Sequence, residues 1–148
     1  MRSFKDAQGR SWDVAVDYAF IRKAKSRLGL DFLDPESNAL GEVFASMETG
    51  CDAIALALES QFEKRGLEGE DRYEGWDGKT LRAALDALVE ELADFFLSGG
   101  RPNLEAAVKK MQDGYGEAVR LTTERVKALD VKDTISKGLS GNAPDGSA

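Results

Sequence analysis

The sequence Gly78-Lys79-Thr80 has the residues that close a phosphate-binding loop, where the lysine and the hydroxyl group contact phosphate and magnesium. The complete pattern needs another glycine five residues before Gly78, and this chain has Tyr73 at that position. We therefore expect no nucleotide site here. We expect instead that Asp77 or Thr80 caps the helix that follows.

Cys51 is the only cysteine, and the chain contains no histidine. A cysteine nucleophile needs a neighbouring group that stabilises the thiolate, and histidine is the usual one. Cys51 falls on the apolar stripe of an expected helix beside Ile54 and Ala55, where a free cysteine packs as a small hydrophobic residue. A single cysteine also excludes an internal disulfide and a cysteine-rich zinc site.

Five carboxylates crowd one expected loop and could hold a hard cation through their oxygen atoms. They are Glu68, Glu70, Asp71, Glu74 and Asp77. Counted from Asp71, the third position of a calcium-binding loop is Tyr73, and no glutamate stands at the twelfth. We expect a solvated acidic loop without a metal. With no cofactor and no catalytic residues expected either, the sequence predicts that the chain is not an enzyme.

The charge balance argues against nucleic acid as a partner. The 148 residues include 27 Asp and Glu against 20 Lys and Arg, a net charge of −7, whereas nucleic-acid binding needs surplus cations. No stretch has the roughly 18 consecutive apolar residues of a membrane span, and the first residues lack the apolar core of a secretory signal. We expect a cytoplasmic protein that binds neither nucleic acid nor membranes.

The main basic cluster is Arg22, Lys23, Lys25 and Arg27, all on one expected helix. Such a cluster is typical of the solvated face of an amphipathic helix, and the nearby acidic residues Asp31 and Asp34 dilute its charge. The alternative is a site for an anionic partner.

Residues 1–17 are predicted to form a β-hairpin with strands at residues 2–5 and 10–16. Gly9 suits the positive φ angle that closes a tight turn. In the second strand Trp12, Val14 and Val16 alternate with polar or small residues, as in a strand with one buried face. An isolated hairpin is only marginally stable, so this face should pack on helices.

Apolar residues at helical spacing predict further helices at about residues 18–28, 40–47, 51–65, 80–97 and 102–129. The expected fold is mainly α (α+β), with the hairpin packed on a bundle of about four to five helices. We expect one globular domain over residues 1–129, of which residues 18–129 are helical. Residues 130–148 are rich in polar residues and glycine and should form a flexible tail.

The last expected helix carries a long apolar stripe. It consists of Leu104, Val108, Met111, Tyr115, Val119, Val126 and Leu129. At 1.5 Å per residue, the shorter helices cannot cover this helix along its whole length. Tyr115, Val119, Val126 and Leu129 are therefore the candidate protein-binding residues, with the two glycines beside Tyr115 as a hinge. In the alternative, the helix folds back at these glycines and buries its own stripe.

Asp6, Gly9, Arg10 and Trp12 form the pattern D-x-x-G-R-x-W, and residues 29–33 read G-hydrophobic-D-hydrophobic-hydrophobic. This combination resembles a group of small proteins from tailed phages and prophage-like loci. The resemblance implies a tail-assembly chaperone, or a small structural protein encoded among tail genes, and it brings no catalytic residues with it.

Two hypotheses about function follow. In the first, the chain is a non-enzymatic tail-assembly chaperone that binds the tail tube or tape-measure protein before assembly. In the second, it is a structural virion protein, such as a tail completion or head–tail joining component. Self-association through the apolar stripe is open under both hypotheses. Mass spectrometry of purified particles separates them, because only a structural protein stays in the finished virion.

Overall fold

The chain begins with an antiparallel β-hairpin, as the alternating residues predict. Strand β1 (Arg2–Lys5) pairs with β2 (Ser11–Val14), and Phe4 lies opposite Trp12. Gly9 has a φ of 81° in the turn, a backbone conformation that favours glycine. This computed structural model describes residues 1–141, with side chains up to Leu129 except those of Val119 and Thr123.

Six α-helices and one short 3-10 helix follow the hairpin within residues 1–141. They are α1 (Tyr18–Leu28), α2 (Ala39–Ala45), α3 (Met47–Ala57), α4 (Glu59–Lys64), η1 (Gly69–Tyr73), α5 (Gly78–Ser98) and α6 (Pro102–Gly141). The chain is mainly helical, at 69% helix, with a two-stranded hairpin packed against α5, so the predicted fold class is confirmed. The chain divides into two compact units, Met1–Gln112 and Asp113–Ala148.

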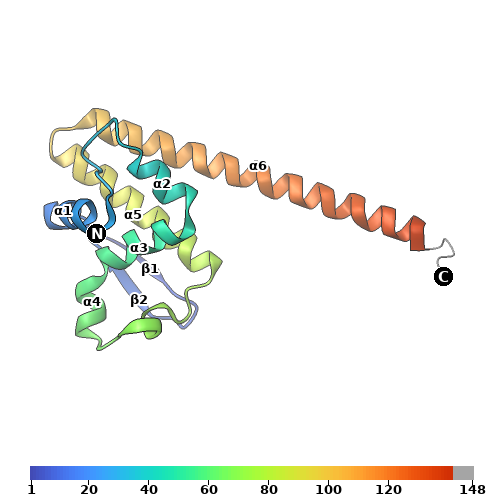
Figure 1. Cartoon of the computed structure of the whole chain (residues 1–148), viewed down its shortest axis with the longest axis horizontal. Coiled ribbons are helices and arrows are strands. Elements are labelled where there is room, and N and C mark those ends of the chain that lie inside the picture. Colours follow the sequence, from blue (N-terminus) through green and yellow to red (C-terminus); the bar gives the residue numbers. More distant parts are fainter. Residues whose placement is uncertain (142–148) are drawn as a thin grey trace. The chain divides into compact units, whose positions relative to one another are not determined.

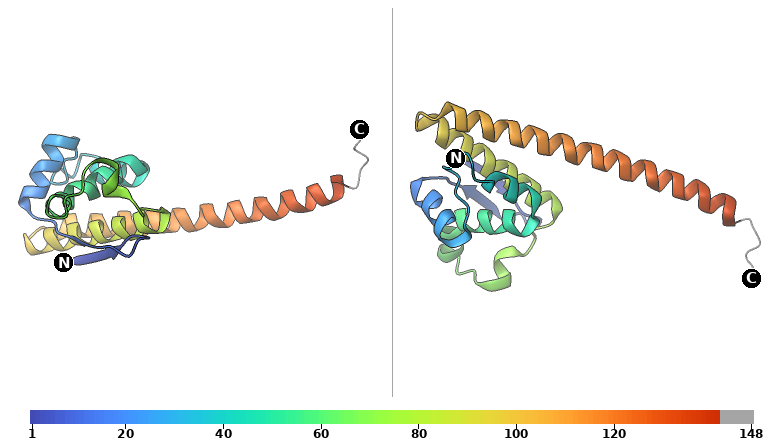
Figure 2. Two further views of the ribbon diagram at one scale, coloured as in Figure 1. Left: turned by 90° about the horizontal axis from the view of Figure 1, so that it is seen from below. Right: turned by 45° about the horizontal axis from the view of Figure 1, so that its top comes forward.

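Helix α5 is the centre of the first unit (Figure 1). The hairpin lies on one side of α5, and helices α1 to α4 lie on the other (Figure 2). Because α5 is covered on both sides, it needs apolar residues around much of its circumference. The buried residues of α5 include Leu85, Leu88, Val89, Leu92 and Phe96.

Local capping fixes both ends of α1. The carboxylate of Asp17 accepts a hydrogen bond from the amide of Phe20 at 2.8 Å, which satisfies a free amide of the first turn. Gly29 ends the helix with a φ of 69°, and the amide of Leu30 bonds back to the carbonyl of Ala24. This turn directs Leu30 into the core, where it is almost completely buried.

Two expected helix boundaries in the middle of the chain are wrong. We expected a break near Gly50, but Gly50 lies inside α3, and a Cβ there would stand 3.0 Å from the carbonyl oxygen of Val43 on α2. The break occurs at Ser46, whose hydroxyl group caps α3. The expected helix 51–65 is also divided at Leu58, which is fully buried between α3 and α4.

Helix α6 extends past Leu129, where we expected it to end, and continues to Gly141. The first part of the expected flexible tail, residues 130–148, is therefore helical, and residues 142–148 lie outside the described residues. The first compact unit ends at Gln112, before the expected domain boundary at residue 129.

Replacing Trp12 by alanine should destabilise the first unit strongly. Trp12 is completely buried and contacts Phe62 edge to face at a ring distance of 5.1 Å. Removing a buried aromatic side chain of this size costs about 3–5 kcal/mol. We expect a fall in melting temperature of about 10 °C or more for Trp12→Ala in the full chain. The control Tyr18→Ala removes an exposed ring, and a melting temperature equally lowered by both would contradict the packing assigned to Trp12.

Candidate functional site

The residues of the D-x-x-G-R-x-W pattern meet around the buried carboxylate of Asp6. Its Oδ1 accepts the backbone amides of Gln8 at 3.0 Å and Arg10 at 2.9 Å. Its Oδ2 accepts the Arg10 guanidinium at 2.6 Å and the Trp12 indole N–H at 3.1 Å. All four hydrogen bonds lie within the hairpin, so the pattern builds a structural turn.

Arginine side chains connect this turn to the segment between α4 and α5. Arg10 donates to the carbonyl oxygens of Asp71, at 3.3 Å, and Glu74. Arg65 stacks on the Trp12 ring at 4.1 Å and donates to the carbonyl oxygen of Ser11 at 2.6 Å. Both cations are thus engaged in the scaffold rather than available to a ligand.

The environment of Asp6 keeps it ionised. Burial by itself raises the pKa of the carboxyl group, but the hydrogen bonds from Arg10 and Trp12 outweigh burial and leave the pKa below its ordinary value. The charge is satisfied by donors on both oxygens, which a buried carboxylate requires. Asp6 is therefore a structural residue, with no free acceptor for chemistry.

The sequence Gly78-Lys79-Thr80 starts helix α5, as we expected. Asp77 caps the helix by accepting the amide of Thr80 at 2.9 Å and its hydroxyl group at 2.8 Å. These hydrogen bonds hold the pKa of Asp77 below its ordinary value. Lys79 is exposed on the first turn.

Cys51 is half-buried on α3, and burial raises the pKa of its thiol. A raised pKa lowers the thiolate fraction at neutral pH and with it the nucleophilicity of the side chain. The packing role expected for Cys51 fits this environment.

The acidic loop includes η1 and turns its aromatic residues toward the core. Tyr73 and Trp76 contact each other edge to face at 5.2 Å, and Phe62 lies 6.1 Å from the Trp76 ring. We expected a surface loop, and in part this is wrong, because Tyr73 and Trp76 are only partly exposed. Among the described residues, no group of three or more carboxylate or thiol side chains is placed to hold a metal ion.

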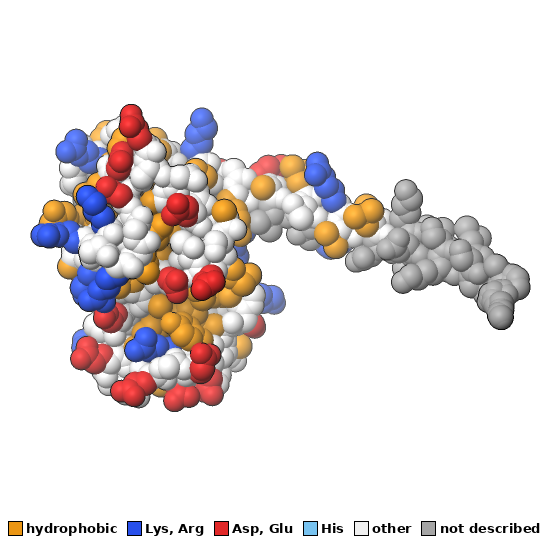
Figure 3. Space-filling model, viewed as in Figure 1, with side chains coloured by type: hydrophobic (Ala, Val, Ile, Leu, Met, Phe, Trp, Pro, Cys, Tyr) orange, Lys and Arg blue, Asp and Glu red, His pale blue; other side chains and the backbone are white. Residues whose placement is uncertain are grey.

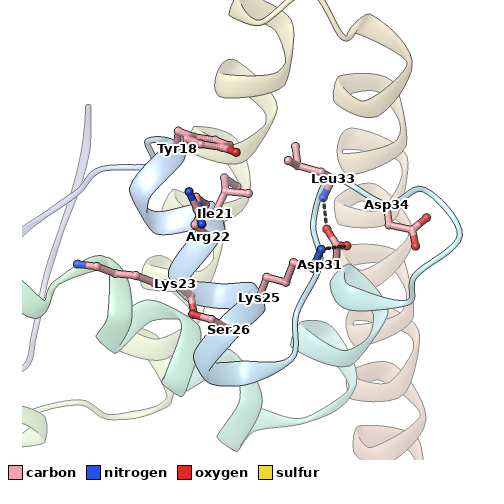
Figure 4. A pocket seen from close by; sticks show the side chains of 9 residues that line it. All are labelled: Tyr18, Ile21, Arg22, Lys23, Lys25, Ser26, Asp31, Leu33 and Asp34. Carbon is pink, nitrogen blue, oxygen red and sulfur yellow. Dashed lines mark hydrogen bonds and ion pairs between the residues drawn. The ribbon is translucent and has the colours of Figure 1, made fainter.

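The basic helix α1 borders an open hollow of about 960 Å³ (Figure 4). Tyr18, Ile21, Arg22 and Lys25 line it from α1. Asp31, Leu33 and Asp34 line it from the following loop. Apolar residues at helical spacing in this helix include Tyr18 as well as Ile21 and Ala24, yet the Tyr18 side chain is 58% exposed. One feature of the sequence could have indicated this hollow. Leu33 directly follows Phe32, and since Phe32 is buried, the neighbouring Leu33 points outward.

The four candidate protein-binding residues all fall on α6, in the unit that begins at Asp113. Val126 is 50% exposed and Leu129 is 59% exposed, and hydrophobic side chains are visible along the described part of the helix (Figure 3). Tyr115 is partly exposed, and the side chain of Val119 lies outside the described part. Helix α6 continues through Gly114 and Gly116, the expected hinge.

Comparison with known proteins adds no relative. No protein-family model, no curated protein and no solved structure matches this chain. Within the described residues, no helix combines the length and the apolar character needed to cross a membrane.

Replacing Asp6 by asparagine should destabilise the protein by about 3 kcal/mol, because an amide NH₂ group then faces donors that need an acceptor. Asp13→Asn is the matched control, since the exposed Asp13 carboxylate accepts a hydrogen bond from the Ser3 hydroxyl group and from no other group among the described residues. Urea unfolding measures both variants. A similar small loss in both would show that the Asp6 carboxylate is not required.

The lowered pKa of Asp6 also predicts an acid dependence. The stabilisation is complete above the ordinary pKa of aspartate and is lost as the pH falls through the lower folded-state pKa. Asp6→Asn should therefore show a shallower loss of stability in this acidic window than the unchanged protein. Equal slopes for the two proteins would contradict the assignment.

Proposed function

We propose that this chain is a non-enzymatic protein-binding module of the tail-assembly chaperone kind, and that its distal α6 face binds the partner. The N-terminal pattern suggests the tail tube or tape-measure protein as that partner. The observation that carries the proposal is the apolar stripe of α6, whose residues Val126 and Leu129 in the second unit are exposed.

The first part of the stripe packs in part within the first unit. Val108 is 1% exposed, whereas Met111 is 39% exposed, and Leu104 and Met111 line a small cavity with Phe32 and Phe96. In the second unit, Val126 is 50% exposed and Leu129 is 59% exposed. An exposed apolar helix face of this kind is suited to a second apolar surface.

The charges beside this face favour an acidic partner over a second copy of the chain. Arg125 and Lys127 are the sequence neighbours of Val126, so each lies about 100° from it around the helix. Glu117 and Glu124 lie on the opposite side, where both pair with Arg120. Two copies facing each other would bring cations together, whereas carboxylates on a partner would pair with them.

Removing the distal part of α6 should leave the first unit folded. We expect a chain that ends at Tyr115 to melt within a few degrees of the full chain, because it retains the buried Val108 and the cavity-lining Leu104 and Met111. Circular dichroism during heating measures this. Unfolding of the shortened chain would show that the distal stripe belongs to the core, and the proposal would then fail.

A single charge on the stripe should abolish partner binding. We expect Val126→Asp to lose co-purification with the tail tube or tape-measure protein encoded in the same genome. Ala128→Asp is the matched control, because it adds the same charge two residues away on the opposite side of the helix. If the unchanged chain binds neither protein, or if both variants bind equally, the proposed function is wrong.

A further inference from the structure

A small cavity lies between the loop that joins α1 to α2 and the start of α6, within the first unit. It has a volume of about 140 Å³. Its buried wall consists of Phe32, Phe96 and Val108, which are 5%, 2% and 1% exposed. Leu104 and Met111 complete its apolar lining. An apolar cavity of roughly 150 Å³ holds one benzene ring, so this cavity has room for one ring or a short branched chain.

The loop that forms the outer wall of this cavity is held by its own hydrogen bonds. The Asp34 carboxylate accepts the amide of Glu36 at 2.9 Å. The hydroxyl group of Ser37 donates to the carbonyl oxygens of Asp31, at 2.5 Å, and Asp34, at 2.9 Å. The cavity is therefore formed before a ligand arrives, which lowers the entropic cost of binding.

The charged residues that line the cavity are both acidic. They are Asp31 and Asp34, and no described lysine or arginine lines it, those of α6 included. Lys25 pairs with Asp31 at 3.5 Å. In the described part of the chain no cation pairs with Asp34, whose side chain points away from α1 and its basic residues (Figure 4). The group that completes these charges is a cation from outside the chain.

We propose that this cavity binds a small organic cation, an ammonium group attached to an apolar body about the size of one ring. The apolar body lies against Phe96 and Val108, and the ammonium group pairs with the Asp34 carboxylate at the rim. Burial of the apolar body contributes most of the affinity. The pair with Asp34 contributes less, because this carboxylate is exposed, but it selects cations over neutral and anionic compounds of the same shape. The site belongs to the first unit and does not depend on the distal α6 face.

The experiment uses the full chain labelled with ¹⁵N and four probes, which are benzylamine, benzyl alcohol, phenylacetate and ammonium chloride. The first three share a ring and differ in charge, and the fourth supplies the cation alone. We expect benzylamine to shift the amide signals of Asp34, Asn38 and Val108 in a saturable way. Benzyl alcohol should bind about threefold more weakly because it lacks the charge, and phenylacetate more weakly still.

Two pairs of variants test the two parts of the site. Asp34→Asn keeps an acceptor for the Glu36 amide and should remove the preference for benzylamine over benzyl alcohol, whereas the control Glu36→Gln removes a carboxylate outside the lining and should retain it. Ala107→Leu should fill the cavity from α6 and abolish binding of both compounds. Its control is Ala106→Leu, at an exposed position outside the lining. Circular dichroism during heating shows that each variant is folded.

Four outcomes would overturn this proposal. Equal affinity for benzylamine and benzyl alcohol would show an apolar cavity without charge recognition. The same shifts with ammonium chloride would show a cation site without an apolar part. No saturable shift with any probe would show that the cavity holds only water. An unchanged preference for benzylamine in Asp34→Asn would show that this carboxylate does not recognise the cation. The test does not involve Val126 or Leu129, so its failure leaves the proposed function of α6 untouched.

Discussion

The buried carboxylate of Asp6 is the interaction on which the first unit depends. A carboxylate taken out of water must have donors on both oxygens, and the hairpin supplies four. Because Arg10 is held by this carboxylate, its other nitrogen atoms reach the backbone between α4 and α5. The Ala7 amide, next to Asp6, bonds to the carbonyl oxygen of Gly75 at 2.7 Å. One buried charge thus positions the segment that closes the aromatic core.

The structural role of Asp6 limits what the D-x-x-G-R-x-W pattern can say about function. Asp6 accepts the hydrogen bonds of the turn, and Gly9 allows its backbone conformation. Arg10 connects the turn to the segment between α4 and α5, and Trp12 fills the core. Each residue type is required by the turn itself. A chain that shares the pattern therefore shares a hairpin, and the surface that contacts a partner lies outside the residues of the pattern.

The features predicted correctly from the sequence are those that local chemistry determines. The alternation around Trp12, the cap at Asp17 and the start of α5 at Asp77 each involve residues within a few positions of one another. The errors concern tertiary contacts. Gly50 lies inside α3, where the backbone of α2 comes too close for a larger residue, and Tyr18 is exposed in the first turn of α1, beside the hollow. The spacing of apolar residues in the sequence shows neither contact. It also does not show that Leu33 lies across the hollow from Tyr18, which only the fold reveals.

The two exposed apolar surfaces, at the hollow of α1 and on distal α6, both have charged residues beside them. The chain has a net charge of −7, yet cations border both the hollow of α1 and the distal face of α6. Acidic side chains gather at the edge of the first unit where the acidic loop lies (Figure 3), and Asp31 and Asp34 also border the hollow. At physiological salt, charges act over about 8 Å, so a segment docked on the distal face of α6 senses Arg125 and Lys127 more strongly than charges farther away. The excess of negative charge opposes nonspecific contact between copies, while the local cations select partners whose apolar groups carry carboxylates beside them.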